Sequence, residues 1–177
     1  MVSFRTSTDL YFFTATNLYW IKLLEDSTHK NIIIESLSFL CKERRVKVLG
    51  FVIMPNHIHL IWYILAPHKR SNVQRDFLKY TAQQIKFNLI KMDSPLLDDI
   101  VVRAKDRVCQ IWERNSLSFE LDNTETLIQK LNYIHNNPVQ EKWSLASLPG
   151  EYYFSSAKFY ETGTDDFGFM THFSEII

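Results

Sequence analysis

The sequence of 177 residues contains little cysteine, glycine or proline, and each shortage excludes a class of protein. Its two cysteines, Cys41 and Cys109, are too few for a disulfide framework and fit no spaced zinc motif. Four glycines and five prolines exclude collagen-like chains and linker-rich disordered chains. Because 46% of the residues are hydrophobic and 14% are aromatic, we expect one compact domain with a substantial core.

Long apolar runs are also missing from the sequence. No stretch approaches the roughly 18–20 apolar residues that cross a membrane. Near the N-terminus, Asp9 and several polar residues interrupt any signal-peptide core. Together with the few cysteines, these absences predict a soluble protein of the cytoplasm that has no membrane partner.

The net charge is zero, with 20 basic and 20 acidic residues, but the charges are unevenly distributed. Residues 68–114 contain 10 Lys or Arg and 6 Asp or Glu, whereas residues 115–177 contain 3 and 9. A basic middle beside an acidic end is typical of a chain that binds a polyanion. Charge that clusters by chance on a solvated surface would give the same pattern.

Hydrophobic patterning and turn residues predict an α+β domain. Strands are expected at 9–21, 46–54, 57–65 and 110–121, and helices at 27–45, 71–92 and 123–137. Residues 93–109 are expected to form an irregular loop. The order β-α-β-β-α-β-α is that of a ferredoxin-like βαββαβ fold with an added C-terminal helix. We place this domain at residues 1–160 and an acidic, apolar tail at 161–177.

Two histidines follow the Pro55–Asn56 turn in the segment MPNHIHLI. Residues two apart on a strand point to the same face, so His57 and His59 are expected to project together. Two imidazoles on one face can bind a divalent cation, but they can also be half-buried histidines on a sheet surface. The Asp and His that follow in a hydrolytic zinc motif are missing here.

The segment LNYIHNNPV ends the last expected helix. The buried stripe of this helix is expected to contain Leu127, Leu131 and Ile134. Tyr133 lies off that stripe and shares another face with Lys130 and Asn137. A tyrosine placed in this way can be offered to a substrate, or it can simply pack on a neighbouring sheet.

Taken together, these motifs resemble a known family. FVIMPNHIHLIW followed by YIHNNPV and EYYFSSAKFY resembles the single-tyrosine HUH transposases of bacterial insertion sequences, and more specifically their domesticated relatives, the REP-associated tyrosine transposases. In that family, an H-x-H on a central strand is followed by a tyrosine with Asn or Gln four residues later. IWERNSLSFEL also matches the W-x-R strand of the family, so the resemblance extends from about Tyr11 to about Tyr160.

The resemblance implies a transposase whose endonuclease and strand-transfer chemistry acts on single-stranded DNA at hairpins. Tyr133 would be the nucleophile and would form a covalent 5′-phosphotyrosine. His57, His59 and Asn137 would hold Mg²⁺ or Mn²⁺. The insertion-sequence relatives are dimers and the REP-associated ones can be monomers, so both a monomer and a homodimer are open. The alternative is a domesticated protein that binds hairpin DNA with little or no cleavage.

Basic residues along the second expected helix and the loop after it form a candidate DNA track. The residues proposed to contact DNA are Arg70, Arg75, Lys79, Lys86, Arg103, Lys105, Arg107 and Lys130. Tyr80, Trp62 or Trp112 could stack on bases beside it, but each is more often the kind of residue that belongs to a core. His135 lies on the side of its helix opposite Tyr133 and is interpreted as structural.

The tail from residue 161 carries four acidic residues and no Lys or Arg, together with several large apolar residues. We expect it to dock on the domain, because a fully solvated segment would not need so many apolar groups. It could cover part of the DNA track or active site, so that DNA must displace it, or it could cover an apolar patch elsewhere.

Overall fold

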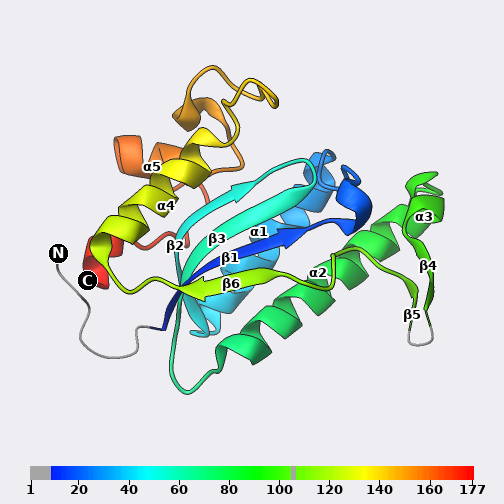
Figure 1. The fold of residues 1–177 in the computed structure, drawn as a ribbon, viewed down its shortest axis with the longest axis horizontal. Helices are drawn as coiled ribbons and strands as arrows, with labels where there is room; N and C mark the ends of the chain where they lie inside the picture. Colours follow the sequence, from blue (N-terminus) through cyan, green and yellow to red (C-terminus); the bar gives the residue numbers. More distant parts are fainter. Residues whose placement is uncertain (1–8, 105–106) are drawn as a thin grey trace.

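The computed structural model describes residues 9–104 and 107–177, apart from the side chains at 103, 104 and 107. Its main sheet has four antiparallel strands in the order β2-β3-β1-β6 (Figure 1). The strands are β1 (Leu10–Thr16), β2 (Val46–Ile53), β3 (His57–Ile64) and β6 (Leu117–Glu120). This is the strand order of a ferredoxin-like domain, so the expected α+β class is confirmed.

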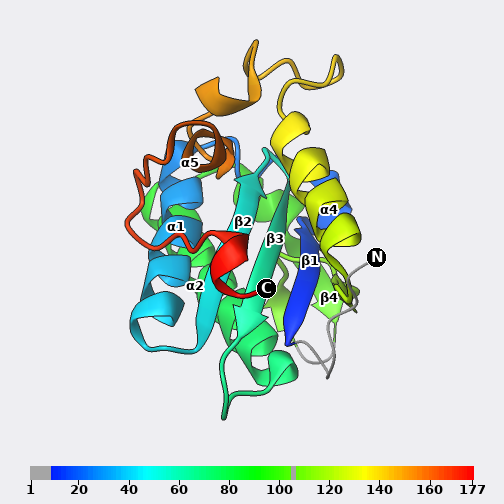
Figure 2. The ribbon, with the colours of Figure 1, turned by 90° about the vertical axis from the view of Figure 1, so that its left-hand side faces the viewer.

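Helices cover both faces of the sheet. Helices α1 (Ser27–Lys42) and α2 (Arg70–Lys91) pack on one face, and α4 (Thr124–Asn136) packs on the other (Figure 2). Helix α4 begins where the side chain of Asn123 accepts the Thr126 N–H at 2.8 Å, which satisfies one of the free amides of the first turn. Among the described residues, no helix is both long and apolar enough to span a membrane.

A glycine in β2 sets how closely α4 approaches the sheet. A Cβ atom at Gly50 would lie 2.6 Å from Cδ2 of Leu131 and 3.1 Å from Cδ1 of Ile134. Both partners belong to the buried stripe of α4 expected from the sequence. Without a side chain at this position, the helix that carries Tyr133 can lie directly on the strand.

Two expected strands are shorter than the sequence patterns predict. The strand expected at 9–21 ends at Thr16, because the chain turns into the short 3₁₀ helix η1 (Leu18–Trp20), where Tyr19 and Trp20 have positive φ. The strand expected at 110–121 pairs only as β6, and Trp112 forms an isolated bridge with Asn17. In both places aromatic and β-branched composition predicts extended chain but cannot locate the bend.

The loop expected at 93–109 contains regular structure. It forms the short helix α3 (Leu96–Asp99) and the strands β4 (Val101–Ala104) and β5 (Arg107–Cys109), which pair with each other outside the main sheet. Strands of three or four residues are too short for a periodic pattern to reveal them.

The tail and the segment before it cover the outer edge of β2. This part of the chain contains η2 (Pro149–Glu151), α5 (Ala157–Thr162) and η3 (Phe173–Glu175). Thr171 N–H donates to the Val48 carbonyl at 2.9 Å, and the rings of Phe167 and Phe169 pack on Phe51. The tail therefore packs on apolar residues at the β2 edge, and displacement of the tail by DNA stays a prediction.

Candidate active site

The histidine pair lies on β3 beneath helix α4. Strand alternation directs Ile58 and Leu60 into the core under α1 and α2, and places His57 and His59 on the opposite face. The centroids of the two imidazole rings are 4.8 Å apart, and both side chains are buried. The two rings therefore sit together at one point, as the H-x-H spacing predicts.

Neighbouring side chains hold one nitrogen of each imidazole. His57 Nδ1–H donates to the Asn56 amide oxygen at 2.7 Å, which leaves Nε2 with its lone pair. His59 Nδ1 is 2.7 Å from the Thr14 hydroxyl, and its Nε2 is buried without a hydrogen-bond partner in the described part of the chain. Metal-binding histidines are typically oriented in this way, through the ring nitrogen that does not face the metal.

Both histidines are neutral at pH 7. Burial lowers the pKa of His57 to about 4, and the nearby Lys142 ammonium acts in the same direction. Burial lowers the pKa of His59 to about 3, helped by His57, Lys130 and Lys142. The neutral imidazole is the form that can donate a lone pair to a cation.

Helix α4 supplies Tyr133 and Asn137 from above. The side chain of Tyr133 is 45% exposed, and its ring centroid is 5.3 Å from that of His59. Asn137 caps the C-terminus of α4 and is buried, and its Oδ1 has no hydrogen-bond partner among the described residues. Tyr133 thus lies off the buried stripe, beside the histidines and open to solvent on one side.

The donor atoms fit a divalent cation such as Mn²⁺, or Mg²⁺ that keeps several waters. Two neutral imidazoles and an amide oxygen would be its ligands, and two buried atoms, His59 Nε2 and Asn137 Oδ1, have no other partner in the described structure. Within residues 9–104 and 107–177, no group of three or more His, Cys, Asp or Glu could hold a metal ion. The proposed ligands are two imidazoles and an amide, which carry no negative charge.

Two lysines place positive charge beside the histidines. The ammonium of Lys130 lies over the rings of Tyr133, Phe12 and Phe119, at 5.7, 5.1 and 5.3 Å from their centroids. Lys142, in the loop after α4, is exposed and lies 6.0 Å from the Trp143 ring, which in turn lies 5.8 Å from His57. Ammonium groups near two neutral imidazoles make this part of the surface attractive to an anion.

His135 has the structural role expected for it. Its Nε2 is 2.8 Å from the Ser156 hydroxyl, and its ring packs on Tyr160 with centroids 5.4 Å apart. Burial lowers its pKa to about 4. His135 therefore joins α4 to the segment along the β2 edge rather than to the Tyr133 face.

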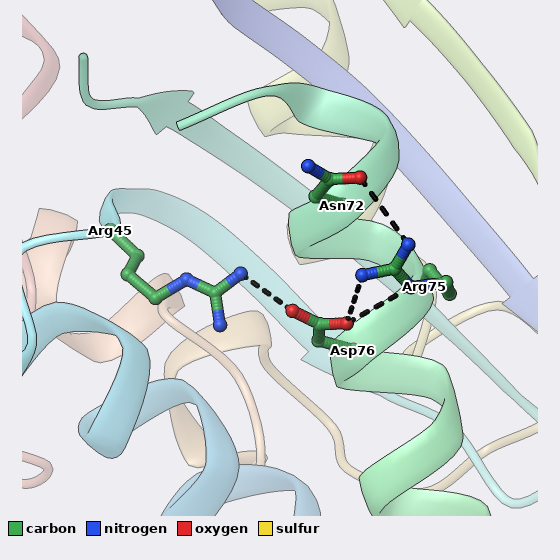
Figure 3. Close-up of polar contacts among 4 residues, drawn as sticks. All are labelled: Arg45, Asn72, Arg75 and Asp76. Carbon is green, nitrogen blue, oxygen red and sulfur yellow. Dashed lines mark hydrogen bonds and ion pairs between the residues drawn. The ribbon is translucent and has the colours of Figure 1, made fainter. Parts of the chain in front are cut away.

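Lys130 lies beside Tyr133, but the described basic residues of α2 in the candidate DNA track lie elsewhere. Helix α2 packs on the face of the sheet opposite α4, so the structure does not bring its basic residues together with Tyr133 (Figure 2). Arg75 donates to Asp76 at 2.9 and 3.1 Å and to Asn72 at 3.4 Å, and Arg45 also pairs with Asp76 (Figure 3).

The remaining members of the track differ in their surroundings. Arg70 lies 5.1 Å over the ring of Tyr11, Lys79 is exposed, and Lys86 is half-buried. Lys105 falls outside the described residues, as do the side chains of Arg103 and Arg107. DNA contacts by these residues stay a prediction.

Two of the three candidate stacking residues belong to the core, which was the alternative expected for them. Trp62 and Trp112 are buried, and the Trp112 indole N–H donates to the Thr81 hydroxyl at 3.1 Å. Large aromatic side chains are more often buried in a core than exposed to solvent. Trp62 and Trp112 pack in the core that α2 covers. Tyr80 is exposed, but on α2.

The sequence patterns missed several residues at the site: Thr14, Trp20, Asn56, Lys142 and Trp143. Asn56 stands directly before the H-x-H and could have been found from that position. Thr14 became a neighbour of His59 only through the pairing of β1 with β3, which no local pattern encodes.

Comparison of the sequence with family models and with curated proteins gives no match. Among solved structures, a REP-associated tyrosine transposase bound to a REP hairpin has a TM-score of 0.63 and 18% identity, over 94% of this chain and 90% of its own. A protein from Deinococcus radiodurans that is assigned as a transposase has a TM-score of 0.51 and 14% identity, over 77% of this chain and 97% of its own. The chain has the fold of these transposases, and the resemblance expected from the motifs is confirmed at that level.

Proposed function

We propose that the chain is a metal-dependent endonuclease and strand transferase, a transposase that acts on single-stranded DNA at hairpins with Tyr133 as nucleophile. The observation that carries the proposal is that two proposed ligand atoms, His59 Nε2 and Asn137 Oδ1, are among the six buried side-chain atoms without a partner in the described structure, and that His59 lies beside an exposed tyrosine. An unsatisfied buried polar atom costs about 1–3 kcal/mol, and a bound cation would remove that cost at these two atoms. The neighbour bound to a REP hairpin supports hairpin DNA as the substrate class.

His57, His59 and Asn137 would hold Mg²⁺ or Mn²⁺. When bound, the ion neutralises charge on the scissile phosphate. The protein orients the two imidazoles through Asn56 and Thr14 and keeps them neutral by burial. Because none of the three ligands is charged, the site keeps its attraction for the DNA backbone.

The covalent step exchanges one phosphodiester for another. The Tyr133 hydroxyl oxygen forms a bond to phosphorus, the bond from phosphorus to the 3′ oxygen breaks, and the phenolic proton passes to solvent as the 3′ oxygen takes one up. The product is a 5′-phosphotyrosine and a free 3′-hydroxyl. Lys130, beside the Tyr133 ring, can pair with the phosphate. A later attack by a DNA hydroxyl reverses the exchange and releases the tyrosine.

The test is the covalent adduct. The protein is incubated with Mn²⁺ and with single-stranded DNA carrying short palindromes taken from the DNA that flanks the gene. We expect a denaturant-resistant protein–DNA adduct, which Tyr133→Phe abolishes while hairpin binding survives, because only the nucleophilic oxygen is lost. Tyr153→Phe, another exposed tyrosine, is the matched control and keeps the adduct. Hairpin binding by the wild type without any adduct would support the binding-only alternative.

A further inference from the structure

Two aromatic side chains stand exposed at the end of β1, next to the candidate metal site. Tyr19 is 68% exposed and Trp20 is 63% exposed. The ring of Trp20 packs edge-on against His57, with centroids 6.3 Å apart. The rings of Trp20, His57, His59 and Tyr133 therefore form a continuous series from the solvent edge of the sheet to the nucleophile.

The backbone holds these aromatics in an unfavourable conformation. Both residues have positive φ, 52° at Tyr19 and 59° at Trp20. Such a conformation is unfavourable for any residue that is not glycine, and exposed rings do not recover that cost through burial. Contacts from elsewhere maintain it, because Tyr19 N–H donates to Glu113 Oε1 at 2.8 Å and Asn56 Nδ2 donates to the Trp20 carbonyl at 3.2 Å.

An open depression of about 680 Å³ lies beside the two rings. Its lining includes Thr16, whose backbone pairs with His57 across β1 and β3, so the depression reaches the strand next to His57. The other polar groups around it are Gln110, Glu113, Arg114 and Asn115. Amide, guanidinium and carboxylate groups are those that hydrogen-bond to the edges of nucleic-acid bases.

We infer that Trp20, with Tyr19, forms a stacking platform for an unpaired base that flanks the scissile phosphate, and that the adjoining depression receives this base. The inference rests on the proposed function, since it assumes DNA at the histidine site. We favour a base over an apolar peptide as the ligand for two reasons. The exposed rings of Tyr19 and Trp20 offer flat stacking faces, and the polar groups of the depression lie near the site where the scissile phosphate is proposed to bind. Trp20 would then be a residue that positions the strand, and the chemistry would stay with Tyr133.

The test uses two short single strands, each about ten nucleotides long, one of oligothymidine and one of abasic sites with the same phosphates. Trp20→Ala is expected to weaken oligothymidine binding roughly 5- to 150-fold, the usual cost of losing one stacked base, and to leave abasic binding unchanged. Trp20→Phe should restore most of the affinity, and Tyr19→Ala should give a smaller loss. Phe87→Ala, at an exposed aromatic on α2, is the control and leaves both affinities unchanged.

Three results would overturn the platform: equal binding of both strands by the wild type, an equal loss of both in Trp20→Ala, or no effect of Trp20→Ala on either. Thermal melting of each variant separates a binding loss from unfolding. The adduct assay with a hairpin substrate judges the proposed function independently. If the adduct forms through Tyr133 while Trp20→Ala changes nothing, only the stacking platform is excluded. If the wild type forms no adduct and binds no DNA, both the proposed function and the platform are excluded.

Discussion

Asn56 links two parts of the site through one amide group. Its oxygen accepts from His57 Nδ1–H, and its nitrogen donates to the Trp20 carbonyl. The same side chain therefore fixes the tautomer of a proposed metal ligand and the position of the exposed indole. Because its two ends have different partners, the amide can take only one orientation.

Replacing Asn56 with alanine is expected to weaken Mn²⁺ binding about 10- to 100-fold, the usual effect of losing a group that orients a metal-binding histidine. His59→Ala removes a ligand and should abolish binding. Titration calorimetry with Mn²⁺ measures both. Asn136→Ala, at an exposed asparagine that bonds only within α4, serves as control. Mn²⁺ affinity that is unchanged in His59→Ala would exclude the proposed metal site.

At the scale of single residues, the sequence was informative where one strand or helix sets the geometry. The H-x-H spacing and the offset of Tyr133 from the stripe of Leu127, Leu131 and Ile134 both predicted the observed faces. Trp20 and Thr14 were missed because their positions depend on a left-handed turn and on strand pairing. Such contacts are tertiary and leave no periodic signal.

At the scale of elements, the placement of α4 on β2 determines where the nucleophile stands. Gly50→Ala puts a methyl group into the contact with Leu131 and Ile134. We expect it to lower the free energy of unfolding by about 1–3 kcal/mol and to reduce adduct formation, because α4 must move away from β3. Denaturant melts and the adduct assay measure the two effects.

The double variant Gly50→Ala/Leu131→Ala supplies the control. Truncating Leu131 removes the atom nearest to the added methyl group. The double variant should therefore lose less free energy of unfolding than the sum of the losses in the two single variants. Strict additivity would show that the methyl group does not press on α4.

The order of the elements was predictable, but their ends were not. Long helices and the β2–β3 pair carry strong patterns, and all of them were found at the expected places. The errors lie in short or irregular segments. The strands expected at 9–21 and 110–121 were predicted too long, and the β4–β5 hairpin was missed. There, contacts with distant parts of the chain decide the conformation.

For the whole molecule, three histidines with a lowered pKa make stability depend on pH. Burial lowers the pKa of His57 and His135 to about 4 and that of His59 to about 3, all below the 6.5 of an exposed histidine. Below pH 6.5 the unfolded chain therefore binds more protons than the folded one, and the stability present at pH 7 is lost as the pH falls toward 4.

For each histidine, the free energy of unfolding is expected to change by at most about 1.4 kcal/mol per pH unit. Denaturant melts between pH 7 and pH 5 measure it, and His135→Gln should flatten the curve without touching the proposed metal ligands. A free energy of unfolding that stays constant over this range would contradict the neutral, buried state of these side chains.

The covered edge of β2 has a consequence for how copies of the chain behave at high concentration. Ile53 N–H donates to the Phe154 carbonyl, Phe51 N–H to the Ser156 hydroxyl, and Thr171 N–H to the Val48 carbonyl. These groups would otherwise template another strand, which is how exposed edges start aggregates. Proteolytic trimming of the C-terminal segment would uncover part of that template while sparing His57 and Tyr133. Because Thr171 supplies one of these contacts, we expect chains trimmed before this residue to associate along β2 more readily than the full chain.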